Sequence, residues 1–338
     1  MREAIVNVSE GDLRERGPGL QCLVLDPAIL PAIAARLTAA LAPPVHPPAP
    51  LVVDGQVAGW LDAARAERLA EFGTVFCLDR RALRFVPAVA RADDRTAAVA
   101  EVARALAAEG ALSAWRDERY AVAPAFGAPP WFLLERAAAR YFGVRTFAAH
   151  VNGLVRDIEA GAGGSTMWFA RRAPTKAIDP GQLDNLVGGG IAAGMTVAAT
   201  VVKEAREEAG IPAALSGEAQ ACGALHLCRA QPDGLQRETI FVHDLWLPAD
   251  FVPAGEDGEV TAHRRVDLAE AARLVSLREG QDLVTADASL VVLDALLRHG
   301  AIAADAPEYL ALDALRHPPD VAATGGPSAS PSAPPSRR

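Results

Sequence analysis

The feature that most constrains this chain is a glycine-rich segment followed directly by an acidic helix. Residues 188–194 read Gly-Gly-Gly-Ile-Ala-Ala-Gly. Thr196 is a natural N-cap for a helix over residues 196–209, and Gly210 is a natural stop. Near the end of this helix, Glu204, Glu207 and Glu208 stand at positions i, i+3 and i+4. At the helical repeat of about 100° per residue, the three carboxylates share one face.

Two explanations account for this acidic face. Like charges at such spacing destabilise an isolated helix by roughly 0.2–0.5 kcal/mol per pair, so something has to offset them. One explanation is a solvated surface that Lys203 and Arg206 partly neutralise. The other is a hard divalent ion, because Mg2+ binds carboxylate oxygens while keeping waters and substrate phosphates in its shell. The three glutamates alone leave both explanations open.

The glycine run favours the metal explanation, because it permits close backbone approach just before the acidic helix. Together the two segments resemble the Nudix box, G-x5-E-x7-R-E-U-x-E-E-x-G-U, with the spacing intact. The matching residues are Gly189, Glu204, Ala205, Glu207, Glu208, Gly210 and Ile211. The chain departs from the box at Met195, which replaces a Glu, and at Lys203, which replaces an Arg. A phosphate-binding P-loop and a dinucleotide fingerprint both need a different order of residues after the glycines.

The resemblance implies a hydrolase that cleaves a diphosphate linkage with Mg2+ or Mn2+. It assigns metal binding to Glu204, Glu207, Glu208 and the Gly189 carbonyl, with Glu204 as the base and Glu207 as its rival. A downstream acidic residue often joins such a site, and Glu259 is the candidate, with an acidic surface turn as the alternative. Neighbouring carboxylates and a metal push a pKa in opposite directions, so the choice of base stays open.

Substrate contacts are expected from residues outside the helix. Arg171, Arg172 and Lys176 follow an expected strand and are candidates for binding phosphate, although a basic surface turn explains them as well. Asn185 is a further substrate-binding candidate, since it lies in a segment that resembles one branch of the family.

That branch is suggested by segments beyond the box. They are residues 135–138, 142–145, 150–153, 183–185, 203–204, 244–245, 247–248 and 298–300. These resemble the Nudix proteins related to the Nudix portion of fungal thiamine pyrophosphokinase fusions. The branch implies hydrolysis of thiamine diphosphate, or preferentially its oxidised analogues, to the monophosphate. The alternatives are a general hydrolase of ADP-ribose, NADH or dNTPs, and a degenerate binding module without turnover.

Charge and composition narrow the partners and the compartment. The formal net charge is -9 and the pI about 5.3, which argues against a nucleic acid or an anionic membrane as partner and favours a small phosphorylated substrate. The four cysteines show no C-x-x-C spacing, and no apolar run approaches the roughly 20 residues of a membrane span. We therefore expect a cytoplasmic protein with reduced thiols, and family habit makes a homodimer plausible.

The length of 338 residues suggests two domains. We expect an α/β fold, namely a Nudix α/β/α sandwich with a mixed sheet over residues 144–316, preceded by a small α+β domain over residues 18–143 that roofs the pocket. An N-terminal extension (1–17) and a disordered tail (317–338) flank them. The expected helices are residues 28–41, 63–72, 93–109, 131–142, 196–209 and 288–299, and the expected strands include a hairpin at 51–60 and residues 74–78, 83–85, 147–155, 166–170, 221–229 and 239–247.

Overall fold

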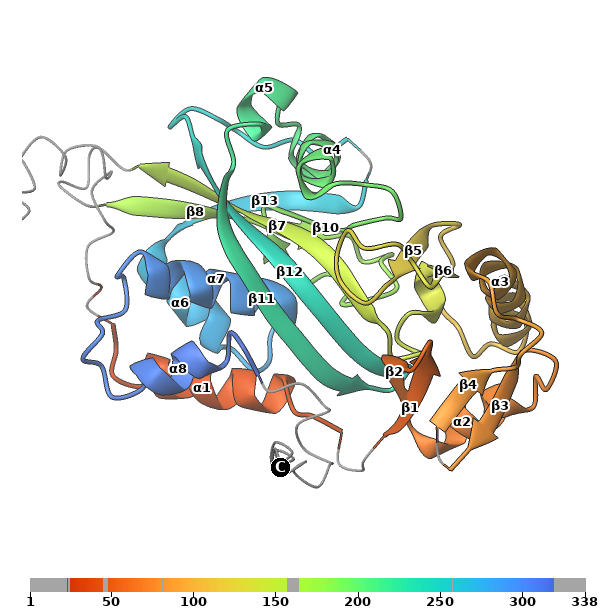
Figure 1. Ribbon diagram of the computed structural model, residues 1–338. Helices are drawn as coiled ribbons and strands as arrows, with labels where there is room; N and C mark the ends of the chain where they lie inside the picture. The colour runs from red at the N-terminus through yellow and green to blue at the C-terminus, as the bar shows by residue number, and fades with distance from the viewer. Residues whose placement is uncertain are drawn as a thin grey trace, which may run out of the picture.

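Figure 1 shows the computed structural model, which describes residues 23, 25–44, 48–80, 82–156, 164–256 and 258–318. The predicted N-terminal extension lies outside the described residues, as does the predicted tail apart from residues 317 and 318. Among the described helices, none is long and apolar enough to cross a membrane.

The smaller part of the fold is built on a four-stranded sheet with the strand order β2-β1-β4-β3. β1 (Ala49–Val53) and β2 (Gln56–Leu61) form the predicted hairpin. Asp54 and Gly55 at its turn have φ values of 48° and 81°, as tight two-residue turns of this kind require. The other elements of this part are α2 (Ala63–Ala70), β3 (Phe76–Asp79), β4 (Ala82–Phe85), α3 (Ala92–Ala108), β5 (Arg119–Val122) and β6 (Phe132–Glu135).

The larger part is built on a seven-stranded mixed sheet with the order β11-β12-β7-β8-β13. β7 (Arg145–Arg156) pairs in parallel with β12 (Gly234–Leu247), whereas its other pairings are antiparallel. β10 (Val187–Gly190) pairs with β7, and β9 pairs with β8. The remaining strands are β8 (Ser165–Arg172), β9 (Leu183–Asn185), β11 (Gln220–Gln231) and β13 (Val260–Asp267).

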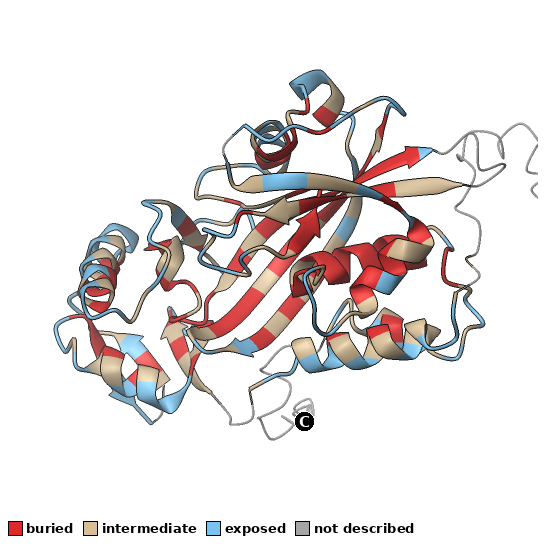
Figure 2. Ribbon diagram, turned by 180° about the vertical axis from the view of Figure 1, so that it is seen from behind, coloured by how far each residue is buried: buried red, intermediate tan, exposed pale blue. Residues whose placement is uncertain are grey.

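Helices cover both faces of this sheet, which confirms the predicted α/β/α sandwich (Figure 1). α4 (Val197–Ala209) packs on one face, where Ala149 and Val151 of β7 meet its apolar side. On the opposite face, Ala148 of β7 joins a cluster with α7 (Ala286–Arg298). β7 is buried along almost its whole length because both of its faces are covered (Figure 2). The short α5 (Ala213–Ser216) follows α4, and α6 (Leu268–Ser276) and α8 (Tyr309–Ala314) lie beside α7.

Helix α1 (Ile29–Ala40) packs against the larger part, although the sequence assigned it to the smaller domain. Ile33 and Leu37 are fully buried in one cluster with residues of α6 and α7. Arg36 donates to the carbonyls of Val275 and Val284 and to the Ser289 hydroxyl, the last at 2.9 Å. The predicted domain limits at residues 18 and 143 stay predictions.

The two parts of the fold meet at a close backbone contact between β2 and the start of β7. The Trp60 N–H donates to the Gly143 carbonyl at 3.1 Å, and Gly59 forms an isolated bridge with Val144. A Cβ at Gly143 would lie 1.8 Å from the Trp60 carbonyl oxygen, and one at Gly59 would lie 2.3 Å from the Phe142 oxygen. Both glycines are therefore required for this contact.

The helix predicted for residues 131–142 is wrong. Phe132–Glu135 form strand β6, and Arg136–Ala138 form a single turn of 3-10 helix. β6 pairs with β5, so Phe132 and Leu134 are buried on one side of the two-stranded sheet. Over so few residues an apolar pattern does not separate a strand from a helix, and the pairing with β5 decides.

Candidate active site

Helix α4 begins and ends where the sequence predicts. The Thr196 hydroxyl accepts the Ala199 N–H at 3.1 Å, which caps the first turn. Gly210 ends the helix in the left-handed region, at φ 63°. Val201 and Ala205 are buried against the sheet, so the register of the helix is fixed and the three glutamates are held on the adjacent face.

Glu208 and Glu204 lie against the glycine strand β10. Glu208 is buried and accepts the Gly188 N–H at 2.8 Å. Burial raises the pKa of Glu208 well above its usual range, and the nearby Asp184 and Glu204 act in the same direction. A Cβ built at Gly189 would lie 2.4 Å from Cδ of Glu204, so only glycine leaves room for this carboxylate.

Lys203 binds two of the three carboxylates. Its Nζ donates to Glu204 Oε1 at 2.9 Å and to Glu207 Oε2 at 2.8 Å. Burial by itself would lower the pKa of Lys203, but the two carboxylates outweigh it and raise it. Met195, the other departure from the box, packs against the core cluster under α4.

The residues of this helix face suit a hard divalent ion in chemistry. Glu204 and Glu208 present carboxylate oxygens beside the backbone of β10, and the space that a Cβ at Gly189 would fill is taken by Glu204. Within the part of the chain that the structure describes, no three acidic, histidine or cysteine side chains converge as a metal-binding group. Glu204 and Glu207 are paired with Lys203 instead.

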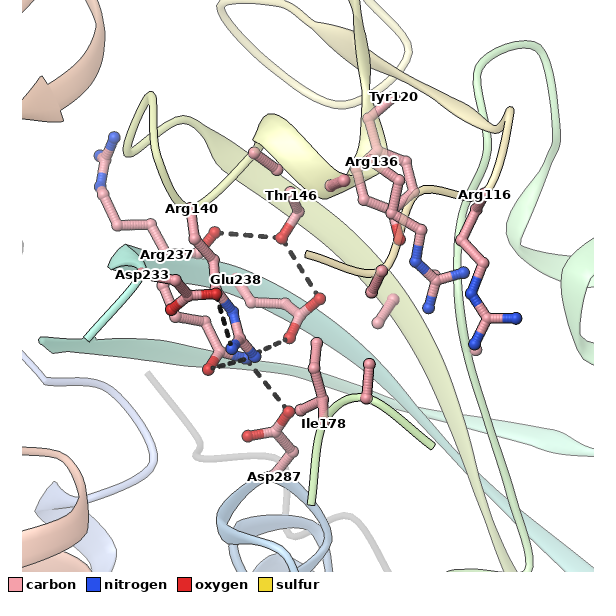
Figure 3. A pocket seen from close by; sticks show the side chains of 18 of the residues that line it. Arg116, Tyr120, Arg136, Arg140, Thr146, Ile178, Asp233, Arg237, Glu238 and Asp287 are labelled. Atoms are coloured by element: carbon pink, nitrogen blue, oxygen red, sulfur yellow. Dashed lines mark hydrogen bonds and ion pairs between the residues drawn. The ribbon is translucent and has the colours of Figure 1, made fainter. Parts of the chain in front are cut away.

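A cavity beside β10 is lined by both parts of the fold (Figure 3). The larger part contributes Gly188–Gly190 together with residues of β7 and β12. From the smaller part, Tyr120 of β5 approaches the glycine strand closely, since a Cβ at Gly190 would lie 1.9 Å from its hydroxyl. The cationic side chains that line the cavity are Arg116, Arg136, Arg140, Arg172, Lys176 and Arg237.

Two of the predicted substrate contacts line this cavity, and two do not. Lys176 and Arg172 line it, and Arg172 pairs with Asp184 at 2.7 Å. Arg171 is outside the lining and is held by Asp282 and by backbone carbonyls. Asn185 is also outside it, in the sheet behind, where its Oδ1 contacts Nδ1 of His150 at 2.8 Å.

The predicted metal residues do not share one site, and of them only Gly189 lines the cavity. Glu207 borders a separate surface groove together with Arg206 and Glu256. Glu259 is not among the residues that line the cavity, but two lining residues hold it, namely Lys176 and Nη1 of Arg116, the latter at 2.9 Å. Burial alone would raise the pKa of Glu259. Lys176 and Arg116 outweigh this effect of burial and hold the pKa below its usual range.

Sequence reasoning missed the residues that the smaller part supplies. Arg136 lies with its guanidinium 5.8 Å from the Tyr120 ring centroid and pairs with Glu118 at 2.6 Å. Arg116 also comes from this part. Arg136 falls in segment 135–138, which resembles the thiamine-related branch, but nothing in that segment marks it as a cavity residue. Both arginines reach the glycine strand only through the packing of the two parts. Glu238 was missed too, although a charged residue in a central strand is a signal that could have been followed.

Comparison with known proteins matches two family models to successive parts of the chain. The family described as "Domain of unknown function (DUF4743)" matches residues 45–146, and the NUDIX domain matches residues 148–287. "Nudix hydrolase 20, chloroplastic" of Arabidopsis thaliana is 37% identical over 273 residues, which cover 78% of this chain and 71% of the plant protein. "Nudix hydrolase 24, chloroplastic" of the same plant is 36% identical over 266 residues, with the same coverage of 78% and 71%. An uncharacterized protein of Saccharomyces cerevisiae is 31% identical over 241 residues, which cover 67% of this chain and 68% of the yeast protein.

The family match explains the acidic helix and the glycine strand together. Nudix hydrolases generally use divalent metals such as Mg2+, and they hydrolyse nucleoside diphosphate-linked substrates. The box residues of this chain lie in the matched segment, and both plant relatives are named as hydrolases. The chain belongs to the Nudix hydrolase family and is a Nudix-type pyrophosphohydrolase.

Proposed function

We propose that this pyrophosphohydrolase cleaves thiamine diphosphate, or preferentially its oxidised analogues, to the monophosphate and phosphate with Mg2+ or Mn2+. The observation that carries the proposal is the cavity itself. It joins the glycine strand of the box to cations from both parts of the fold, and Tyr120 of the smaller part also lines it. A small organic diphosphate matches this arrangement better than a polymer. The thiamine portion is inferred from the segments that resemble the thiamine-related branch.

Different side chains bind the diphosphate and the metal ion. Arg116, Arg136 and Lys176 attract the diphosphate, and their charges offset the negative charge that develops as the P–O bond breaks. Glu204, Glu207, Glu208 and the Gly189 carbonyl would hold the metal ion, with Glu259 joining them. When bound, such an ion supplies charge neutralisation at the phosphate oxygens and makes water more acidic.

The proton of the attacking water goes to a carboxylate. Glu204 is the proposed base, and its Oε1 is bound by Lys203 at 2.9 Å. Burial raises the pKa of Glu204, and Lys203 opposes this shift. A raised pKa brings a carboxylate closer to the operating pH, which suits a general base. The water oxygen bonds to the outer phosphorus as the bridging P–O bond breaks. The bridging oxygen leaves with the organic monophosphate, and the outer phosphorus is released as inorganic phosphate.

One assay tests the substrate. The full chain with Mg2+ is incubated with thiamine diphosphate, oxythiamine diphosphate, oxothiamine diphosphate, ADP-ribose, NADH and oxidised dNTPs, and phosphate-containing products are quantified. We expect phosphate release from the thiamine compounds, and loss of it with EDTA. Hydrolysis of ADP-ribose or dNTPs, with none of the thiamine compounds, would support the hydrolase reaction but contradict thiamine diphosphate and its analogues as substrates. If none of the compounds is hydrolysed, the result would contradict the proposed hydrolysis and favour a binding module without turnover.

A further inference from the structure

The acidic side chains that line the cavity gather at one of its two ends (Figure 3). Arg116 and Arg136 lie at one side, and the acidic residues Asp233, Glu238 and Asp287 lie at the other, together with Arg140 and Arg237. The cationic side is next to the box, because Arg136 neighbours Tyr120, whose hydroxyl approaches Gly190. The acidic side is therefore the end away from the reacting phosphates.

Two of the three acidic groups are neutralised by the protein itself. Asp233 pairs with Arg140 at 3.5 Å, and Asp287 pairs with Arg229 at 3.5 Å. Glu238 is different. Among the residues that the structure describes, none forms an ion pair with it, and its partners are the neutral side chains of Thr146 and Gln236.

The hydrogen bonds to Glu238 satisfy only part of its capacity. The Thr146 hydroxyl lies 3.2 Å from Glu238 Oε1 and also 3.2 Å from the Arg237 carbonyl, and its single proton cannot serve both. Gln236 Nε2 donates to Glu238 Oε2 at 3.0 Å. An ionised carboxylate has about four acceptor sites, so at least two remain for a ligand. Burial raises the pKa of Glu238, and Asp287 acts in the same direction, whereas His150, Gln236 and Arg140 act against it.

The surrounding network fixes this carboxylate in place. Gln236 Oε1 accepts from Nε of Arg229 at 2.9 Å and from Nη2 of Arg140 at 3.2 Å. Its amide nitrogen is thereby turned toward Glu238. Glu238 also lies opposite Thr146 in the parallel register of β12 and β7, at the centre of the sheet. The acceptor is held on rigid strands, as specificity groups in ligand pockets commonly are.

We propose that Glu238 determines substrate specificity by accepting hydrogen bonds from a nitrogen heterocycle that presents an amino or ring N–H group. The inference rests on the proposed function for the orientation of the ligand, with its diphosphate at the side of Arg116 and Arg136. The heterocycle lies at the opposite end and supplies the donor that Glu238 lacks. Diphosphates without such a donor leave the carboxylate unsatisfied and bind less well.

The test compares Glu238→Gln with the wild-type full chain on two diphosphates. Thiamine diphosphate carries the donor, and isopentenyl diphosphate carries the same diphosphate without any nitrogen. We expect Glu238→Gln to raise KM for thiamine diphosphate about tenfold or more, as loss of a charged acceptor does, with kcat little changed. kcat/KM for isopentenyl diphosphate should stay the same. The matched control is Glu101→Gln, at an exposed position of α3.

Two other outcomes of these kinetic measurements would contradict the proposed role of Glu238. An equal loss on both diphosphates would indicate a structural role for Glu238, and no loss on either would remove its role in recognition. If wild type hydrolyses neither thiamine diphosphate nor its oxidised analogues, the proposed function fails, and binding measurements then test the inference. In that case, calorimetric titration measures the binding of thiamine monophosphate, AMP and methyl phosphate to wild type and to Glu238→Gln. Weaker binding of an amino-bearing ligand to Glu238→Gln supports the inference, and equal binding, or none to wild type, overturns it.

Discussion

At the scale of single residues, each box glutamate of this hydrolase has a different environment. Glu208 is buried against the Gly188 N–H, Glu204 occupies the space beside Gly189, and Glu207 is more exposed, at 38% of its side chain. The sequence predicts that the three share a face, because helical spacing alone determines it. It does not predict that Lys203 binds two of them, because that depends on side-chain conformations.

Glu208→Gln should separate activity from stability. The amide oxygen can still accept the Gly188 N–H, and the buried charge is removed, so the fold should be retained. Turnover with Mg2+ should fall by about 100-fold or more, as for loss of a charged group at a reacting centre. Steady-state kinetics and thermal unfolding in EDTA measure the two effects. Full activity would remove Glu208 from the metal site, and Glu218→Gln, at an exposed residue, is the control.

Gly189→Ala should disturb the same site through space alone. The new Cβ would overlap Cδ of Glu204, and that side chain is flexible enough to move away without unfolding α4. We expect kcat to fall by about tenfold or more, since misplacement of a catalytic group by about 1 Å is costly. Circular dichroism should show an unchanged helix content. Wild-type kcat in this variant would show that the position of Glu204 is not critical.

At the scale of elements, the caps of α4 are predictable because they depend on neighbours in sequence, namely Thr196 and Gly210. Strand β6 is not predictable in this way, because its conformation depends on pairing with β5. The same distinction applies to the site. The box residues lie within one strand-loop-helix segment, whereas Arg116 and Arg136 reach the cavity from segments that are distant from the box in the sequence.

An ion network ties β7, β12 and α7 together, and it predicts a pH dependence. Asp244 is 3% exposed and accepts from Arg298 at 2.8 Å, from Asn152 at 3.0 Å and from His299 at 2.6 Å. Burial by itself would raise the pKa of Asp244, but His299 and Arg298 outweigh it and hold it well below its usual range. A lowered pKa stabilises the fold above the unfolded-state pKa of about 4, and this stability is lost as the pH falls through the folded-state value.

Asp244→Asn should therefore lower the free energy of unfolding by about 3 kcal/mol near neutral pH, the usual cost of breaking a buried pair. The difference in the free energy of unfolding between this variant and wild type should narrow as the pH falls below about 4. Urea denaturation of both proteins across this range measures it. A difference in unfolding free energy that stays constant with pH would contradict the lowered pKa of Asp244. Asp305→Asn, an exposed change, should show no such difference at any pH.

At the scale of the whole molecule, the contact between the two parts depends on glycine. Gly143→Ala would place a Cβ 1.8 Å from the Trp60 oxygen, in a backbone that already has φ 55°. The backbone must shift, and Arg116, Tyr120 and Arg136 should shift with it. We expect a lower melting temperature and a raised KM. Gly73→Ala, where a Cβ meets nothing within 4 Å, is the matched control. An unchanged KM would show that the cavity does not depend on this contact.

The packing of α1 has a consequence for how the chain folds during synthesis. Arg36 binds Val275 and Ser289, which follow it by 239 and 253 residues. Contacts that close such long loops form late. The smaller part can complete its own core while α1 still has no partner, so the apolar residues Ile33 and Leu37 stay exposed until the last helices have left the ribosome. Of the helices that the structure describes, the first to be made is thus among the last to dock.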